Sequence, residues 1–334
     1  MDWKLHRLRT CMLRMTRWYL RWLICGLLFF AGGAAFAADE DRLLRLAYDS
    51  EVTGARREFF VYLPVGYSQG EQGDWPVMLF LHGNGERGDG LDDLDYVLTH
   101  GPLMEAWIQR RELPFIIISP QLPLFGELEA IAERKPVKPA RLPQGVPPRN
   151  YGFPSNLPIQ RGNAGEFPAG YHTQIGDYPD LASLPAGWDR IDEELIGMLD
   201  TVLEEYAADP DRVYLTGLSM GGFGAFHLAA GYPERWAAVA TIVGTGKLGD
   251  AKKLADARLP IWMFGGGKDT VVKPHWLYEM ARALEEAGHP SLRFTVHEDM
   301  DHDAWKRVYE GSDLYTWFLR FSASARPMPE KSSN

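Results

Sequence analysis

The stretch Val213-Tyr214-Leu215-Thr216-Gly217-Leu218-Ser219-Met220-Gly221-Gly222 carries the strongest signal in the 334-residue chain. A β-branched and aromatic run leads into a Gly-x-Ser-x-Gly pattern, and helical residues follow over 223–230. This order is typical of a nucleophile elbow, in which glycines admit a sharp strand-to-helix turn that leaves the serine hydroxyl exposed. We therefore predict that Ser219 is a nucleophile. The alternative is a glycine-rich turn with an inert serine.

Outward from this stretch, short strand-like runs alternate with helical patterns. The repetition of strand and helix predicts an α/β protein with a mostly parallel sheet and helices on both faces. Apolar residues recur at helical spacing over 191–206, 274–287 and 303–321. The expected strands are 58–63, 77–81, 115–119, 212–216, 238–243, 261–264 and 292–297.

Composition narrows the functional class. The chain is 46% hydrophobic and 24% charged, which is typical of a globular protein with a sizeable core. Its net charge is −10, and beyond residue 37 there are 29 basic and 44 acidic side chains. Nucleic acid is therefore not an expected partner, because phosphate recognition needs a basic face. Both cysteines, Cys11 and Cys25, precede the main body, which excludes a thiol nucleophile and a cysteine-ligated metal there.

The N-terminal segment resembles an export signal. Arg14, Arg17 and Arg21 precede an apolar run over 23–30, and Ala35-Phe36-Ala37 fits a small-residue cleavage site. We predict a signal peptide over 1–37, a periplasmic or extracellular location after cleavage, and membrane contact only during export. The alternative is an uncleaved anchor helix, although the apolar run is short for a bilayer span.

We expect one globular domain over 38–325 with a flexible tail over 326–334. A proline- and glycine-rich insertion interrupts the domain near residues 120–187, where 12 of the 23 prolines lie. We predict that the insertion, 122–187, is an ordered cap over one end of the sheet, and the alternative is a mobile flap without function. Its aromatic residues either line a substrate pocket or pack on the surface: Tyr151, Phe153, Phe167, Tyr171 and Tyr178.

A serine nucleophile needs a base, and the base needs an orienting carboxylate. In this architecture the three follow in the order serine, acid, histidine. Asp269 follows the strand at 261–264, and His302 follows the last strand, so both are expected at the carboxyl edge of the sheet. The alternatives for the acid are Asp299, Asp301 and Asp303, and those for the base are His275 and His297.

Acyl transfer also needs donors for the oxyanion. Leu81-His82-Gly83-Asn84-Gly85 follows a strand at the expected place, and we predict that the backbone N–H groups of Asn84 and Met220 form the oxyanion hole. His82 is expected to support the loop, with catalysis as the alternative. Glu86-Arg87-Gly88 is expected to pin the loop through an ion pair, with direct substrate contact as the alternative. No metal-binding or nucleotide-binding motif occurs, so we expect no metal and no cofactor.

Several linked motifs resemble the α/β-hydrolase superfamily. They are His82-Gly83-Asn84-Gly85-Glu86-Arg87-Gly88, Ile117-Ile118-Ser119-Pro120-Gln121, Asp211-Arg212-Val213-Tyr214, the elbow and His302. The chain is similar to secreted esterases of the phospholipase/carboxylesterase, polyhydroxybutyrate depolymerase-like and feruloyl or acetylxylan esterase groups, often described as predicted peptidases. The resemblance covers roughly 45–121 and 188–320, and the long insertion departs from it. It implies the α/β-hydrolase fold, a Ser219–Asp269–His302 triad and ester hydrolysis without a cofactor.

The sequence thus predicts a serine esterase acting on a small-molecule or polymer-borne ester. The alternatives are a serine peptidase of the prolyl oligopeptidase type and a non-catalytic binding module on a hydrolase scaffold. Such peptidases generally carry a β-propeller, for which about 297 mature residues leave no room. The natural ester and the oligomeric state are not indicated by the sequence.

Overall fold

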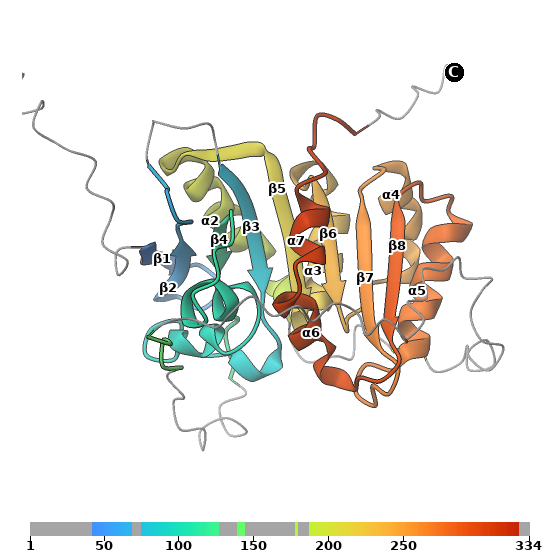
Figure 1. The fold of residues 1–334 in the computed structure, drawn as a ribbon, viewed down its shortest axis with the longest axis horizontal. Coiled ribbons are helices and arrows are strands. Elements are labelled where there is room, and N and C mark those ends of the chain that lie inside the picture. The colour runs from blue at the N-terminus through green and yellow to red at the C-terminus, as the bar shows by residue number, and fades with distance from the viewer. Residues whose placement is uncertain (1–41, 69–74, 127–138, 144–177, 180–186, 327–334) are drawn as a thin grey trace, which may run out of the picture. The chain divides into compact units, whose positions relative to one another are not determined.

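The computed structural model describes residues 42–68, 75–126, 139–143, 178–179 and 187–326. The predicted signal peptide, most of the insertion and nearly all of the tail lie outside the described residues. Eight strands form one sheet in the order β1-β2-β4-β3-β5-β6-β7-β8 (Figure 1). The strands are β1 (Leu43–Ser50), β2 (Ala55–Tyr62), β3 (Trp75–Leu81), β4 (Ile116–Ser119), β5 (Ala208–Leu218), β6 (Ala238–Ile242), β7 (Ile261–Gly266) and β8 (Leu292–His297).

The sheet is mostly parallel, as predicted. Strands β3 to β8 pair in parallel, whereas β1 pairs with β2, and β2 with β4, in antiparallel fashion. In β3, Val77, Leu79 and Leu81 pack into the core on one face, and Met78 and Phe80 pack into the core on the other. This burial of both faces explains why the parallel strands read as continuous apolar runs.

Helices cover both faces of the sheet, again as predicted. The first core contains side chains from α2 (Asp192–Glu205), α3 (Met220–Gly231), α4 (Ala251–Asp256) and α5 (Pro274–Glu286). The second contains side chains from α6 (Trp305–Glu310), α7 (Asp313–Phe318) and the short helical segments Leu94–Leu98 and Met104–Ile108. In Figure 1, α6 and α7 cross in front of the central strands.

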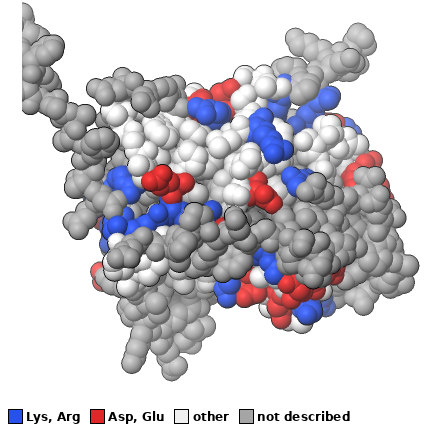
Figure 2. Space-filling view, in the orientation of Figure 1, with Lys and Arg blue, Asp and Glu red and all other residues white. Residues whose placement is uncertain are grey.

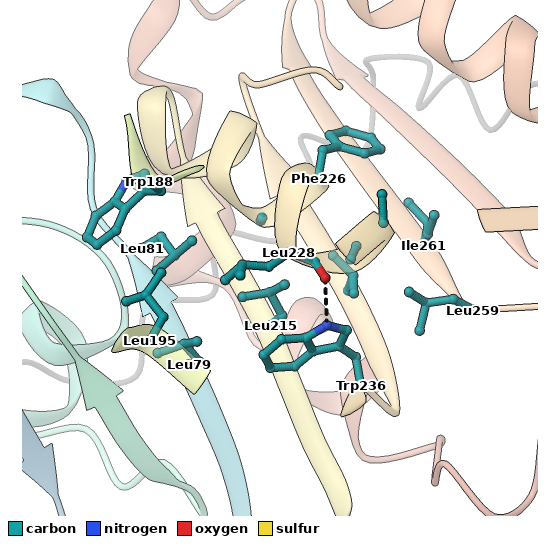
Figure 3. Packing of buried hydrophobic residues seen from close by; sticks show 14 of the residues in the cluster. Leu79, Leu81, Trp188, Leu195, Leu215, Phe226, Leu228, Trp236, Leu259 and Ile261 are labelled. Atoms are coloured by element: carbon teal, nitrogen blue, oxygen red, sulfur yellow. Dashed lines mark hydrogen bonds between the residues drawn. The ribbon is translucent and has the colours of Figure 1, made fainter. Parts of the chain in front are cut away.

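Large apolar side chains fill the first core. Trp188 packs near Leu81 at the end of β3, and Trp236 lies between α3 and the sheet (Figure 3). The Trp236 indole donates a hydrogen bond of 3.2 Å to the Leu228 carbonyl, so its polar atom is satisfied inside the core. This packing fixes α3, and therefore the residue at its N-terminus, against the strands.

The helical pattern predicted over 303–321 corresponds to two helices and not to one continuous helix. The chain leaves the helix at Gly311, which is extended, and α7 begins two residues later. Arg111 donates hydrogen bonds to the carbonyls of Tyr309 (2.9 Å) and Glu310 (2.7 Å). In a continuous helix these carbonyls would accept hydrogen bonds from backbone N–H groups four residues later. Here Arg111, which is distant in sequence, supplies donors to them instead.

Charges of both signs are interspersed over the surface in view. Lys and Arg side chains lie beside Asp and Glu side chains on the face in Figure 2, with no broad basic field among the coloured residues. Within the part of the chain that the structure describes, no helix combines the length and the apolar composition needed to cross a membrane.

Candidate active site

Ser219 lies between the last residue of β5 and the first residue of α3. Its φ of 51° and ψ of −119° place a non-glycine residue in a region that costs of order 1–3 kcal/mol. The backbone around Ser219 is closely packed, since a Cβ on Gly221 would lie 1.9 Å from the Leu81 carbonyl oxygen and one on Gly217 would lie 2.1 Å from the Gly221 oxygen. The glycine pattern is therefore required by backbone packing.

Three predicted site residues are joined by hydrogen bonds. Ser219 Oγ lies 3.0 Å from His302 Nε2, and His302 Nδ1 lies 2.8 Å from Asp269 Oδ2. The Asp269 side chain is fully buried. Its other oxygen, Oδ1, accepts the backbone N–H groups of Val271 (2.8 Å) and Val272 (2.9 Å). When Asp269 is ionised, Nδ1 must donate to it, so the Nε2 lone pair faces the serine hydroxyl.

The three alternative carboxylates have other partners. Asp299 forms a two-bond ion pair with Arg307 (2.7 and 2.6 Å), and this hydrogen bonding lowers the pKa of Asp299 to about 2. Asp303 accepts from Lys306 at 2.8 Å. Asp301 accepts the backbone N–H of His302, also at 2.8 Å, and so touches the main chain and not the ring.

The two alternative histidines are buried in the fold. His297, in β8, stacks on Phe264, and burial lowers the pKa of His297 to about 4. His275 is the second residue of α5 and packs edge-on against Trp276. The described contacts therefore bring His302, and neither alternative, to the serine.

The predicted oxyanion loop passes directly over the elbow. A Cβ on Gly83 would lie 2.8 Å from a Leu218 methyl group and 3.6 Å from Ser219 Cβ. Asn84 and Met220 line the same cavity as Ser219. The two predicted N–H donors thus belong to residues that flank the serine on the cavity wall.

His82 holds this loop in place. Its Nε2 accepts the Leu122 N–H at 2.9 Å, so its proton lies on Nδ1, which contacts the Gly83 carbonyl at 2.6 Å. Burial lowers the pKa of His82 to about 4. The Trp188 indole also donates to the His82 carbonyl at 3.2 Å. Both ring nitrogens are engaged by the backbone, which fits the predicted supporting role.

The Glu86-Arg87-Gly88 segment is also tied to distant parts of the chain. Glu86 pairs with His100, fourteen residues away. Arg87 donates to the Pro123 carbonyl at 3.0 Å and to Asn84 Oδ1 at 3.3 Å. These contacts fix the loop after β3 to the chain that follows β4.

Ser219 opens into a cavity of about 580 Å³. The lining is mostly apolar and includes several ionisable side chains, among them His227, which pairs with Asp192 at 3.1 Å. His227 is not among the predicted site residues. It lies at helical spacing from Met220 and Phe223 along α3, and its place on the cavity wall depends on the tertiary fold. The apolar lining residues are Trp188, Met220, Phe223, Val271, Val272 and Trp276, and the ionisable ones are Asp189, His227, Lys247 and Asp250.

One aromatic residue of the insertion reaches the cavity wall. The Tyr178 hydroxyl contacts Thr245 Oγ1 at 2.8 Å and donates to the Gly246 carbonyl, and both residues line the cavity. The other aromatic residues of the insertion, for which a pocket and a surface position are both open, lie outside the described residues: Tyr151, Phe153, Phe167 and Tyr171. Among the residues that are described, no group of three or more histidine, cysteine or acidic side chains is placed to hold a metal ion.

Comparison with known proteins agrees with this architecture. Residues 175–312 match the Dienelactone hydrolase family. The chain is also 28% identical over 120 residues to the bifunctional acetylxylan esterase/xylanase XynS20E of Neocallimastix patriciarum, which covers 36% of this chain and 17% of that protein. The matched region is thus a small part of a much longer relative.

Solved structures resemble the chain more broadly. A thermostable esterase has a TM-score of 0.52 at 23% identity, covering 84% of this chain and 64% of that one. A mutant feruloyl esterase module from Clostridium thermocellum, complexed with sinapinate, has a TM-score of 0.50 at 13% identity, covering 88% and 91% of the two chains. With the sheet order and the strand–serine–helix elbow, these likenesses show that the chain has the α/β-hydrolase fold.

Proposed function

We propose that this protein is a serine hydrolase that cleaves carboxylic esters through an acyl-enzyme. One observation carries the proposal: Ser219, His302 and Asp269 are hydrogen-bonded in series, with the serine held at positive φ beside a cavity. A serine, an imidazole and a buried carboxylate in this arrangement supply a nucleophile, a base and an orienting charge.

The geometry supports one role for each residue. Ser219 Oγ attacks the ester carbonyl while its proton moves to His302 Nε2, and Asp269 stabilises the resulting imidazolium. The backbone N–H groups of Asn84 and Met220 donate to the oxyanion, where each such donor contributes about 10²–10³ in rate. His302 then protonates the departing alcohol, and the acyl-enzyme forms.

Deacylation reverses these roles. A water molecule gives its proton to His302 and attacks the acyl carbonyl, and the same two N–H groups stabilise the second oxyanion. His302 returns the proton to Ser219 Oγ as the carboxylic acid leaves. The residues are then in their starting protonation states.

The cavity favours a small or aromatic acyl group on a small-molecule or polymer-borne ester. Trp188, Phe223 and Trp276 give it flat apolar walls, and Asp189, Lys247 and Asp250 add polar groups to the lining. The related proteins named as acetylxylan and feruloyl esterases support an ester over an amide substrate.

Hydrolysis of p-nitrophenyl esters from acetate to dodecanoate tests the proposal. We expect turnover by the wild type, a preference for the shorter esters, and loss of orders of magnitude in kcat for Ser219→Ala. Full activity of Ser219→Ala would contradict it. Cleavage of a p-nitroanilide in the absence of ester turnover would favour a peptidase, and inactivity on both would favour a binding module.

Export is part of the proposal. The arginines before the apolar run and the Ala35-Phe36-Ala37 site support cleavage after residue 37. N-terminal sequencing of the protein recovered from a producing cell tests this. A mature chain beginning at Ala38 is expected, and an intact N-terminus in the membrane fraction would indicate an anchor instead.

A further inference from the structure

The geometry points to Glu86 and His100 as a positioning pair that links the oxyanion loop to the His302 imidazole through Trp305. This inference rests on the proposed function and goes beyond it, because neither residue takes part in the proton transfers described above. Glu86 lies in the short helical turn Asn84–Glu86 and is only 5% exposed.

The Glu86 carboxylate lies directly under the oxyanion loop. Its Oε2 is 3.4 Å from the point that a Cβ on Gly83 would occupy, and that point is 3.6 Å from Ser219 Cβ. The same oxygen is 3.8 Å from His82 Nδ1, on the ring that supports the loop. A shift of this carboxylate is therefore expected to move the backbone that carries the Asn84 N–H.

Glu86 is held in the ionised form. Burial opposes its charge, but the hydrogen bond that His100 donates, with smaller contributions from the other neighbours of this carboxylate, outweighs this effect and lowers the pKa of Glu86. An ionised carboxylate accepts hydrogen bonds only, so His100 must donate its Nδ1 proton to Glu86 Oε1. The pair thus fixes the carboxylate and places a donor beside a negative charge that would otherwise oppose a developing oxyanion.

Trp305 connects this pair to the base. Its ring centroid is 5.6 Å from that of His100 and 5.1 Å from that of His302, and both contacts are edge-to-face. Trp305 begins α6, three residues after His302. The indole therefore limits how far the His302 ring moves, and His100 limits how far the indole moves.

The oxyanion loop and the His302 imidazole, which Glu86, His100 and Trp305 connect, act in the same chemical step. The proton reaches His302 as charge develops on the carbonyl oxygen, so both must stay aligned with Ser219. Misplacement by about 1 Å costs on the order of 10²-fold in rate. Removing the positioning pair is therefore expected to lower kcat. The apolar cavity stays the same, so KM is expected to be unchanged.

Kinetics of Glu86→Gln, His100→Phe and the double variant on p-nitrophenyl acetate test the inference. His100→Phe keeps a ring against Trp305 and loses the N–H donor, and at 30% side-chain exposure it is expected to fold even if Glu86→Gln does not. We expect each single variant to lower kcat about tenfold or more with KM unchanged. The double variant should be no slower than the slower single, because the pair acts as a unit.

Glu105→Gln is the matched control. Glu105 is also buried, at 3% exposure, and pairs with Arg111 instead of a residue at the site. It should lower the melting temperature without lowering kcat. Wild-type kcat in His100→Phe, additive losses in the double variant, or an equal kcat loss in Glu105→Gln would each overturn the inference.

Labelling of Ser219 by a fluorophosphonate separates this result from failure of the proposed function. A wild type that neither hydrolyses esters nor is labelled would refute both the function and the positioning pair. A wild type that is active and labelled, with variants labelled equally fast, would refute only the pair. Slower labelling of both single variants at unchanged fold supports it.

Discussion

Replacing Asp269 by asparagine tests the triad most directly, because the structure fixes how the new amide must point. Asp269 Oδ1 accepts two backbone N–H groups, from Val271 and Val272, and Oδ2 faces His302 Nδ1. The asparagine oxygen must stay with the two N–H groups, which leaves the amide NH₂ facing the imidazole. His302 Nδ1 then has to accept, so its proton moves to Nε2 and faces Ser219.

The magnitude follows from comparing the two orientations. Flipping the amide would restore an acceptor for Nδ1 but leave two buried N–H groups facing an NH₂, at about 1–3 kcal/mol each. The unproductive tautomer therefore dominates. A correctly placed imidazole in the wrong tautomer lowers kcat by about 10⁴, which corresponds to about 5 kcal/mol in the activation free energy.

The assay is kcat on p-nitrophenyl acetate at neutral pH, with circular dichroism to verify the fold. Asp299→Asn is the matched control, since Asp299 pairs with Arg307 and does not contact the His302 ring. It should keep wild-type kcat. If Asp269→Asn retains a tenth of the activity or more, or if Asp299→Asn loses as much, the assignment of Asp269 is refuted.

Three further predictions concern packing, pH and the cavity. Gly221→Ala should destabilise the fold by roughly 3 kcal/mol in urea, because its Cβ would lie 1.9 Å from a carbonyl oxygen, whereas Gly231→Ala, with nothing within 4 Å, should not. Burial lowers the pKa of His297 to about 4 from 6.5, so the native state stays neutral where the unfolded state binds a proton. Stability should therefore fall as pH drops from 6.5 to about 4, by up to about 3 kcal/mol from this group, and His297→Phe should flatten that part of the unfolding curve. Phe223→Ala should raise KM about tenfold for esters with an aromatic acyl group and leave KM for the acetyl ester unchanged. Equal effects on both KM values would contradict the cavity's role.

The central strands could be predicted from sequence because both of their faces are buried. Their apolar runs are continuous, and each of the expected strands from 58–63 to 292–297 overlaps a strand in the structure. β1 was missed since it lies at the sheet edge and most of its residues are only partly buried, so no continuous run marks it. The local apolar spacing gives no sign of the break at Gly311, and Arg111, which donates to the carbonyls just before it, lies far away in the sequence.

The parts of the candidate site that depend on neighbouring residues in the sequence could be predicted. The parts that depend on contacts between distant segments could not. The elbow at Ser219 follows from glycine spacing after a strand, which the chain needs to avoid backbone collisions. The contribution of His227 to the cavity depends on how α3 faces α2, and helical spacing alone does not reveal it. The pair of Glu86 with His100 is likewise a tertiary contact across fourteen residues.

The choice among four aspartates illustrates how local and long-range contacts combine. Asp269 accepts the N–H groups of the second and third residues after it, a turn that ends where Pro274 begins α5. That turn satisfies one carboxylate oxygen locally and holds the side chain so that the other oxygen is presented to a partner. Asp299 has both oxygens engaged by Arg307 and has no oxygen of this kind left to orient an imidazole. An aspartate that is half satisfied by its own turn, just after a parallel strand, is therefore the better predictor of an orienting acid than an aspartate beside the histidine in sequence.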